Sequence, residues 1–317
     1  TGTPQDVHGS GAPSASTTTD EFQSYLSQIT EIANEIERGK ELGVTYLLGA
    51  QALIDYYIGR AKIALETMPD PPEDMPEEIR QRLIASRPTL EDAAERWRER
   101  INALGNPSEY FVYAVMRQVN NAAEDLNLPE MQVVIRPQDP AYDGEGTAAK
   151  FDDHLGREGI RPAVEFYETR ETTSGNWPWK TPEKMHSEIN EGTFVPLEFT
   201  HLLYPQQHYA AYVHEIGHYE DAYNPEFASA QERATEWLGT VTEWTSEETS
   251  PERLTKINSN KIAISSLISN YATERPNELI AESYTMWRHP DFDDLHPQTK
   301  AMVEYILGQS DDDPLAD

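Results

Sequence analysis

Apolar residues recur at helical spacing through the first third of the chain, and the pattern changes after residue 130. The i, i+3, i+4 spacing between Glu21 and Asn127 predicts four or five amphipathic helices separated by prolines and glycines. The apolar positions that carry this periodicity include Phe22, Leu26, Ile29, Ile32, Ala33 and Ile36, then Leu47, Leu48, Ala52, Ile54 and Ile58.

From Met131 onward the chain mixes strand-like and helix-like runs. Short runs rich in β-branched and aromatic residues predict three strands, at Met131 to Arg136, Ala163 to Thr169 and Thr193 to Phe199. Gln207 to Tyr219 has the pattern of a continuous helix that ends before Asn224-Pro225. Three or four more helices are expected after it. We therefore expect a mainly helical α+β fold with a small sheet.

The same patterns divide the chain into four parts. The first residues are rich in Ser, Thr, Gly and Pro and are expected to form a flexible tail, and the last residues an acidic, disordered one. The predicted parts are a tail at 1–20, a helical region at 21–130, a catalytic domain at 131–308 and an acidic tail at 309–317. Thr1 follows either the removal of a leader segment or an arbitrary start, and both interpretations stay open.

The predicted helix at Gln207 to Tyr219 contains the pentapeptide His214-Glu215-Ile216-Gly217-His218. Two histidines four residues apart lie on one helical face, where their imidazoles can share one metal ion. A glutamate after the first histidine lies beside the open metal position and can act as a general base. Such a string arises by chance in roughly 3 of 100 chains of this composition, so its helical context is needed to support it.

A third ligand is required, because a catalytic zinc keeps three protein ligands and one open position. Pro276 suits the first turn of a helix that would run to Arg288, and it places Glu278 and Glu282 four residues apart on one face. Glu278 can then reach the metal, while Glu282 can accept the free ring N–H of a ligating histidine. The alternative is that both are solvated carboxylates, like most other glutamates of the chain.

These motifs carry a resemblance to a known family. H-E-x-G-H followed some fifty to sixty residues later by Tyr-x6-Glu-x3-Glu resembles the gluzincin peptidases of the anthrax lethal factor type, over about His201 to Leu307. Related domains occur in bacterial toxins, secreted prolyl-bond endopeptidases and phage head-morphogenesis proteins. The resemblance implies a zincin-like catalytic domain with one Zn²⁺ per chain. It differs at Leu279-Ile280 and Ser283-Tyr284, where the family more often has aromatic residues, so the substrate stays open.

The resemblance also implies a role for individual residues. His214, His218 and Glu278 would hold the zinc, Glu215 would be the base, and Glu282 would orient a ligand. Tyr271, seven residues before the third ligand, would stabilise the oxyanion, and its alternative is a core aromatic beside a helix start. In such domains a strand usually borders the cleft, where an extended substrate can pair with it. The candidate cleft residues are Thr193, Phe194, Val195, Pro196 and Leu197.

The roles of several other side chains are not decided by the sequence. His201 and His208 either line the cleft or are ordinary buried histidines. Trp177-Pro178-Trp179 is either a binding lip or a lid on the core. The segment from His289 to His296 matches no calcium-loop template, and we expect a solvated connecting turn there.

The chain is strongly acidic. Asp plus Glu number 56 and Lys plus Arg 25, for a net charge of −31, and there is no cysteine. This composition is typical of proteins adapted to molar salt, where carboxylate repulsion is screened. An acidic surface that meets a basic partner is the alternative. No cysteine means no disulfide or thiol catalysis, direct nucleic-acid binding is not expected, and no apolar run is long enough to span a membrane.

The sequence therefore predicts a zinc-dependent endopeptidase that acts on protein or peptide substrates in a high-salt environment. Two alternatives stay open. The chain is either a minor head or connector protein of a halophilic virus, with virion assembly partners, or a zinc-stabilised binding module without turnover. Its location is unknown, and both virion association and secretion after N-terminal processing fit.

Overall fold

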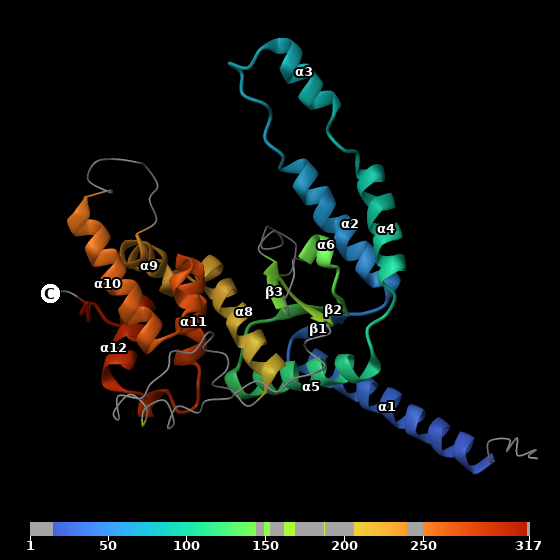
Figure 1. The fold of residues 1–317 in the computed structure, drawn as a ribbon. Helices are drawn as coiled ribbons and strands as arrows, with labels where there is room; N and C mark the ends of the chain where they lie inside the picture. Colours follow the sequence, from blue (N-terminus) through green and yellow to red (C-terminus); the bar gives the residue numbers. More distant parts are fainter. Residues whose placement is uncertain are drawn as a thin grey trace, which may run out of the picture.

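The structure is a computed structural model that describes residues 15–143, 149–152, 162–168, 187, 206–239 and 250–315. These residues are mainly helical and include one mixed sheet of four strands, so the fold is α+β as predicted (Figure 1). Within these ranges, no helix combines the length and apolar character that crossing a bilayer requires.

Capping residues define where several of the N-terminal helices begin and end. Thr89 and Asp92 form a capping box at the start of α4, the Ser108 hydroxyl caps α5, and α5 ends at Asn127 with a left-handed φ of 47°. α1 begins inside the expected tail, because a helix once nucleated propagates cooperatively into adjoining residues. The helices are α1 (Ala15–Glu41), α2 (Ala50–Glu66), α3 (Glu77–Ala85), α4 (Leu90–Leu104) and α5 (Glu109–Leu126).

The sheet joins segments that are distant in the sequence. Its spatial order is β1-β2-β4-β3, in which β1, β2 and β4 are parallel and β3 runs antiparallel to β4 at one edge. The strands are β1 (Val44–Leu47), β2 (Met131–Pro137), β3 (Ala149–Asp152) and β4 (Ala163–Glu168). The boundary expected at residue 130 thus falls inside one sheet, because β1 precedes it and pairs with β2.

Two of the predicted strands are present as β2 and β4, whereas the prediction for the segment around Leu47 is wrong. Its apolar residues were expected in a helix, but Val44–Leu47 forms β1, since a four-residue apolar run does not distinguish a buried strand from a helix by spacing. β3 was missed because only four residues, including a Lys and an Asp, carry it. The third predicted strand, from Thr193 to Phe199, lies outside the described residues.

Five α-helices follow the sheet in the described part of the chain, with short 3₁₀ turns between them. They are α8 (Gln207–Tyr223), α9 (Ala230–Leu238), α10 (Pro251–Leu267), α11 (Pro276–Trp287) and α12 (Pro297–Ile306). The segment after α12 is acidic but not disordered through Leu315, so that prediction is wrong for residues 309–315. Arg233 of α9 donates to the Ser310 carbonyl and pairs with Asp311 at 2.9 Å, and Leu315 packs against the core.

The sheet separates two hydrophobic cores. Val133 and Ile135 of β2 belong to the main core with α5, α8 and the C-terminal helices. Val134 between them faces the opposite way, into a smaller core with Leu53 of α2 and Ile101 of α4. This is the alternation of successive side chains that a strand imposes. The main core therefore carries α8 and α11.

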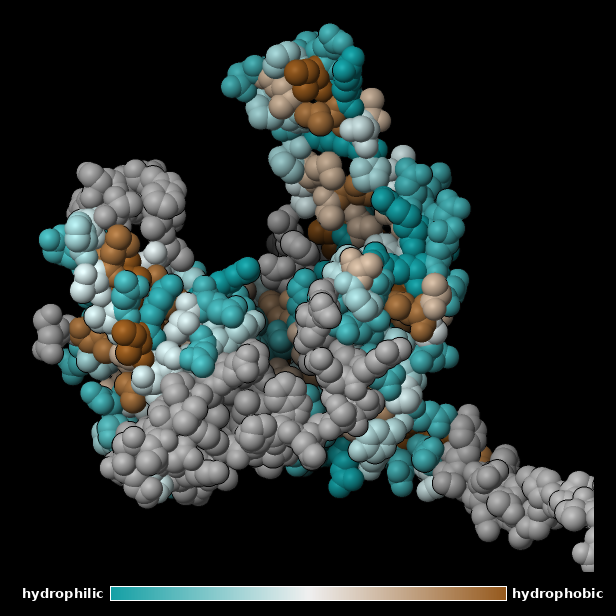
Figure 2. Space-filling model, in the orientation of Figure 1, coloured by the Kyte–Doolittle hydropathy of each residue, from teal (hydrophilic) through white to brown (hydrophobic). Residues whose placement is uncertain are grey.

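Helices α2 and α4 pack side by side and project from the sheet as an arm, with α3 at its far end (Figure 1). Apolar side chains on α3 are exposed at this end: Ile79, Leu83 and Ile84. In the space-filling view, the arm and the C-terminal helices stand on either side of a wide notch (Figure 2).

A buried set of ionic and aromatic side chains, here called the arm-base network, joins the arm to the sheet. Arg136 of β2 contacts Asp143 of α6 (Pro140–Asp143) at 2.5 Å and Glu165 of β4 at 3.3 Å, and Arg60 of α2 contacts Glu165 at 2.5 Å. The hydroxyl of Tyr57 also lies 2.5 Å from Glu165. The network consists of Tyr57, Arg60, Arg136, Asp143, Glu165 and Tyr167.

Candidate metal centre

Helix α8 places the histidine motif in the interior of the protein. The helix is Gln207–Tyr223 and ends at Asn224, which lies in extended conformation before Pro225. His214 and Glu215 are buried, and the side chain of His218 is 15% exposed. Because the two histidines lie four residues apart on α8, their rings come together, with centroids 4.9 Å apart.

Gly217 allows a second helix to approach α8 closely. A Cβ at this position would lie 2.8 Å from the Cα of Ala281 in α11, nearer than real Cβ contacts come. Ala281 lies between Glu278 and Glu282, so the close crossing at Gly217 carries both carboxylates to the histidine face. A glycine inside a helical pattern often marks a close approach of two elements. Gly217 is therefore the sequence signal from which the close approach of α11 to α8 could have been predicted.

Glu278 completes a three-residue group that can hold a metal ion. Its Oε2 lies 3.3 Å from the Nε2 of His214 and 3.4 Å from the Nε2 of His218. Bonds of about 2.05 Å at tetrahedral angles separate neighbouring ligand atoms by about 3.35 Å, so this spacing fits a zinc-sized ion. The same Oε2 is buried and meets no hydrogen-bond donor in good geometry, whereas Oε1 accepts from Asn277 at 3.2 Å.

Glu282 lies behind the group, against the second nitrogen of the His214 ring. Its Oε1 is 2.9 Å from the Nδ1 of His214, and its side chain is fully buried. Its Oε2 accepts a hydrogen bond from the hydroxyl of Ser269 at 2.6 Å, and Ser269 in turn accepts the backbone N–H of Ala272. This chain fixes the ring orientation of His214. Ser269 was not singled out in the sequence, because an isolated serine in a polar stretch carries no signal.

Tyr271 lies at the same centre. It begins the 3₁₀ turn η4 (Tyr271–Thr273), in which the backbone N–H of Ala272 donates to the hydroxyl of Ser269. The ring centroid of Tyr271 is 6.0 Å from that of His214. Burial, followed by the nearby carboxylates of Glu278 and Glu215, raises the pKa of Tyr271 above the ordinary value of 10. The phenol therefore stays protonated and can donate a hydrogen bond at neutral pH.

The electrostatics of the centre favour a cation. Burial alone lowers the pKa of His214, but contact with Glu278 and Glu282 outweighs it and raises that pKa to about 10. Burial would likewise raise the pKa of Glu278, and the two imidazoles hold it well below its ordinary value. Three buried carboxylates, of Glu215, Glu278 and Glu282, thus face two histidines. A divalent ion can replace the proton that these groups otherwise share.

Glu215 points toward the edge of the sheet. Its Oε2 accepts the backbone N–H of Phe151 in β3 at 2.5 Å. In β3 this N–H faces away from β4, so the edge of the sheet holds the carboxylate beside the histidines. Phe151 was not predicted at the site, because the strand that carries it was missed.

The remaining candidates fall elsewhere. His208 is a core histidine, packed edge-to-face against Phe111 and Phe166, and burial lowers its pKa to about 4. His289 and His296 accept backbone N–H groups in local turns. Among the residues that the structure describes, His214, His218 and Glu278 are the one group with metal-ligand spacing. The candidate cleft residues Thr193, Phe194, Val195, Pro196 and Leu197, with His201, Trp177 and Trp179, lie outside the described residues.

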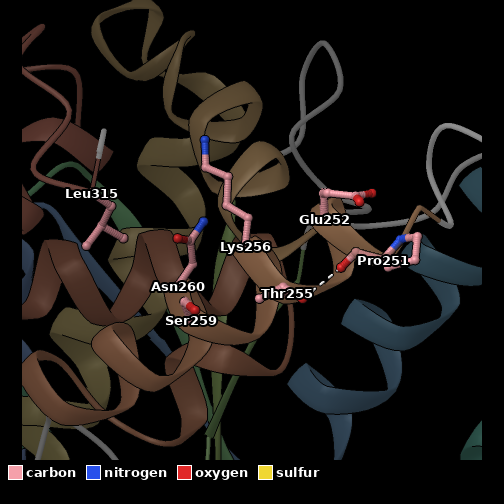
Figure 3. A pocket seen from close by; sticks show the side chains of 7 residues that line it. All are labelled: Pro251, Glu252, Thr255, Lys256, Ser259, Asn260 and Leu315. Carbon is pink, nitrogen blue, oxygen red and sulfur yellow. Dashed lines mark hydrogen bonds between the residues drawn. The ribbon is translucent and has the colours of Figure 1, made fainter.

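A groove on the C-terminal helices is separate from this centre. It measures about 620 Å³ and runs along α10 opposite Leu315, between polar side chains such as Lys256 and Asn260 (Figure 3). The described residues that line it include neither histidine nor tyrosine. None of them belongs to the group formed by His214, His218 and Glu278.

Comparison of the chain with known protein families, with curated proteins and with solved structures finds no match.

Proposed function

We propose that the protein is a zinc-dependent endopeptidase. The observation that carries the proposal is the group formed by His214, His218 and Glu278, in which the Glu278 Oε2 lies 3.3 Å and 3.4 Å from the two imidazole Nε2 atoms, as neighbouring ligands of a tetrahedral zinc ion would. Glu215 and Tyr271 lie beside this group, as they would in the gluzincin family that the motifs resemble.

His214, His218 and Glu278 would hold the metal. A bound zinc ion would supply Lewis-acid polarisation of a peptide carbonyl and lower the pKa of a water molecule. Two neutral imidazoles and one carboxylate leave the ion with a net positive charge, which that chemistry requires. Glu282 and Ser269 would keep the ring of His214 in the ligating orientation.

Glu215 would move the proton. Its carboxylate takes a proton from the water that attacks the carbonyl carbon and passes it to the leaving amine. The Phe151 N–H holds the carboxylate in place without blocking its other oxygen. Tyr271 would donate its hydroxyl proton in a hydrogen bond to the carbonyl oxygen as that oxygen becomes negatively charged.

The test compares the purified wild-type protein with two substitutions in molar chloride, using a complex peptide mixture and mass spectrometry. We expect about one zinc per chain in all three proteins. Glu215→Gln should lower peptide hydrolysis by about 10² to 10⁴, and Tyr271→Phe by about 10² to 10³ with little change in KM. Glu232→Gln, on the exposed face of α9, serves as the matched control and should be unaffected.

Two outcomes would contradict the proposal. Glu215→Gln as active as the wild type would remove the base from the mechanism. Full zinc occupancy of the wild type without cleavage of any peptide would favour the binding module that zinc stabilises.

A further inference from the structure

An aromatic stripe leads away from Glu215 along α8. Tyr219 and Tyr223 follow Glu215 at intervals of four residues, so all three side chains lie on one face of the helix. That face looks at β3, because Phe151 donates its N–H to Glu215 and its ring contacts both tyrosines. The ring centroid of Phe151 lies 6.0 Å from that of Tyr219 and 6.5 Å from that of Tyr223, and the two tyrosines are 5.2 Å apart.

The stripe runs from the buried centre to the surface. Glu215 is 8% exposed, Tyr219 is partly exposed and Tyr223 is 39% exposed. Ligand sites combine aromatic and apolar side chains with a few polar groups, and this stripe places partly exposed rings on the same helical face as Glu215.

We propose that Phe151, Tyr219 and Tyr223 form a substrate subsite that accepts an aromatic or large aliphatic side chain of a peptide. The proposal rests on the proposed peptidase function. The rings provide faces and edges on which another ring can stack. An acidic side chain is disfavoured there, because Glu215 contacts the backbone of Phe151 and the chain carries a net charge of −31.

Helix geometry places the accepted side chain along the substrate. Tyr219 and Tyr223 lie about 6 Å and 12 Å from Glu215 along the helix axis, at 1.5 Å per residue. An extended peptide advances about 3.3 Å per residue. For a peptide that lies along α8, the selected side chain is therefore about two to four residues from the scissile bond, on one side of it only.

The experiment measures cleavage of an internally quenched peptide library, randomised at four positions on each side of the scissile bond, in molar KCl. For the wild type we expect a preference for Phe, Tyr, Trp, Leu or Met at one position two to four residues from the bond. Tyr223→Ala should lose this preference and lower kcat/KM for the preferred peptides about 10-fold through KM, because the contact is equal in the ground and transition states.

Two variants separate the ring from other effects. Tyr223→Phe keeps the ring and should keep the preference. Tyr110→Ala removes a tyrosine that is 79% exposed on α5 and should leave the profile unchanged. Zinc content should be the same in every variant.

The outcomes separate the subsite from the peptidase function. If the wild type cleaves peptides and Tyr223→Ala keeps the same preference, the subsite is overturned and the peptidase function stands. If the zinc-loaded wild type cleaves nothing, the peptidase function fails, and binding of a labelled Phe-containing peptide and its Ala counterpart then decides the subsite. Selective binding that Tyr223→Ala removes would support it, and equal binding of the two peptides would overturn it.

Discussion

The metal centre and the arm-base network are both buried clusters of ionisable side chains, but their charges are arranged differently. In the arm-base network, Arg60 and Arg136 face Glu165 and Asp143, so two positive charges meet two negative ones. Each of the two carboxylates also accepts hydrogen bonds from its partners. Such a cluster is complete and needs no further ligand.

In the metal centre the acidic side chains outnumber the basic ones. Three carboxylates face two histidines, and no arginine or lysine takes part in the contacts described there. The side chains come together only because the helices that carry them cross closely at Gly217. Three buried carboxylates beside two histidines shift the pKa of His214 upward and that of Glu278 downward, and perturbed groups clustered in this way are typical of functional sites.

The largest effect is expected from Glu278→Ala. Removing a ligand should lower zinc affinity by more than about 100-fold, beyond the effect of outer-shell changes, and abolish measurable hydrolysis. In the presence of a chelator the same variant should also be less stable than the wild type at neutral pH, because His214 and His218 lose the carboxylate whose pKa they hold low in the folded protein. Elemental analysis and denaturant unfolding measure these two quantities. Unchanged zinc content would exclude Glu278 from the site.

Arg136→Met should lower stability and leave zinc binding unchanged. It leaves Glu165 and Asp143 buried without their main cation and should lower the free energy of unfolding by about 3 to 5 kcal/mol. The folded variant should bind zinc as the wild type does. Arg82→Met, whose side chain is 78% exposed in its pair with Glu78, is the matched control and should change stability by less than about 0.5 kcal/mol. A loss of stability no larger than that of the control would mean that the network contributes nothing.

His208 is a third kind of buried titratable group, held neutral by its surroundings. Its pKa in the folded protein is about 4, below the ordinary 6.5 of the unfolded chain. Between pH 6.5 and 4 the unfolded chain therefore binds a proton that the folded protein does not, and stability falls as the pH falls through this window. His208→Phe should remove about 3 kcal/mol of this dependence.

The measurement is denaturant unfolding of both metal-free proteins at pH 7 and pH 4.5. The carboxylates that also titrate in this range are common to both proteins, so they cancel in the difference. An identical pH dependence in the two proteins would show that His208 is protonated in the folded state.

A smaller effect is expected from Gly217→Ala. The added methyl group would meet the backbone of Ala281 and push α11 away from α8, with a loss of about 1 to 3 kcal/mol and weaker zinc binding. Gly59→Ala in α2 is the control, because its Cβ would meet nothing within 4 Å and helix propensity should stabilise the protein by about 0.5 to 1 kcal/mol. If the Gly217→Ala variant binds zinc as tightly as the wild type, the close crossing of α8 and α11 does not position Glu278.

Local periodicity was enough to predict much of the helical structure and half of the described sheet. The helix from Gln207 and the helix from Pro276 were predicted from apolar spacing and from prolines at their ends, and both are present. The histidine and glutamate pairs follow from 3.6 residues per turn, which depends on no other part of the chain. Strands β1 and β3 were not predictable in this way, because each has four residues and is defined by its partners.

The sequence alone determined which side chains share a helical face, since that depends only on backbone geometry. It placed His214 beside His218 and Glu278 beside Glu282, but it could not decide whether the two pairs meet. The tertiary structure decided that through the close approach of α8 and α11 at Gly217, and it brought Phe151 and Ser269 to the site from other elements. Contacts between distant segments depend on how whole elements pack, and packing is set by the combined shape of many side chains rather than by any local spacing.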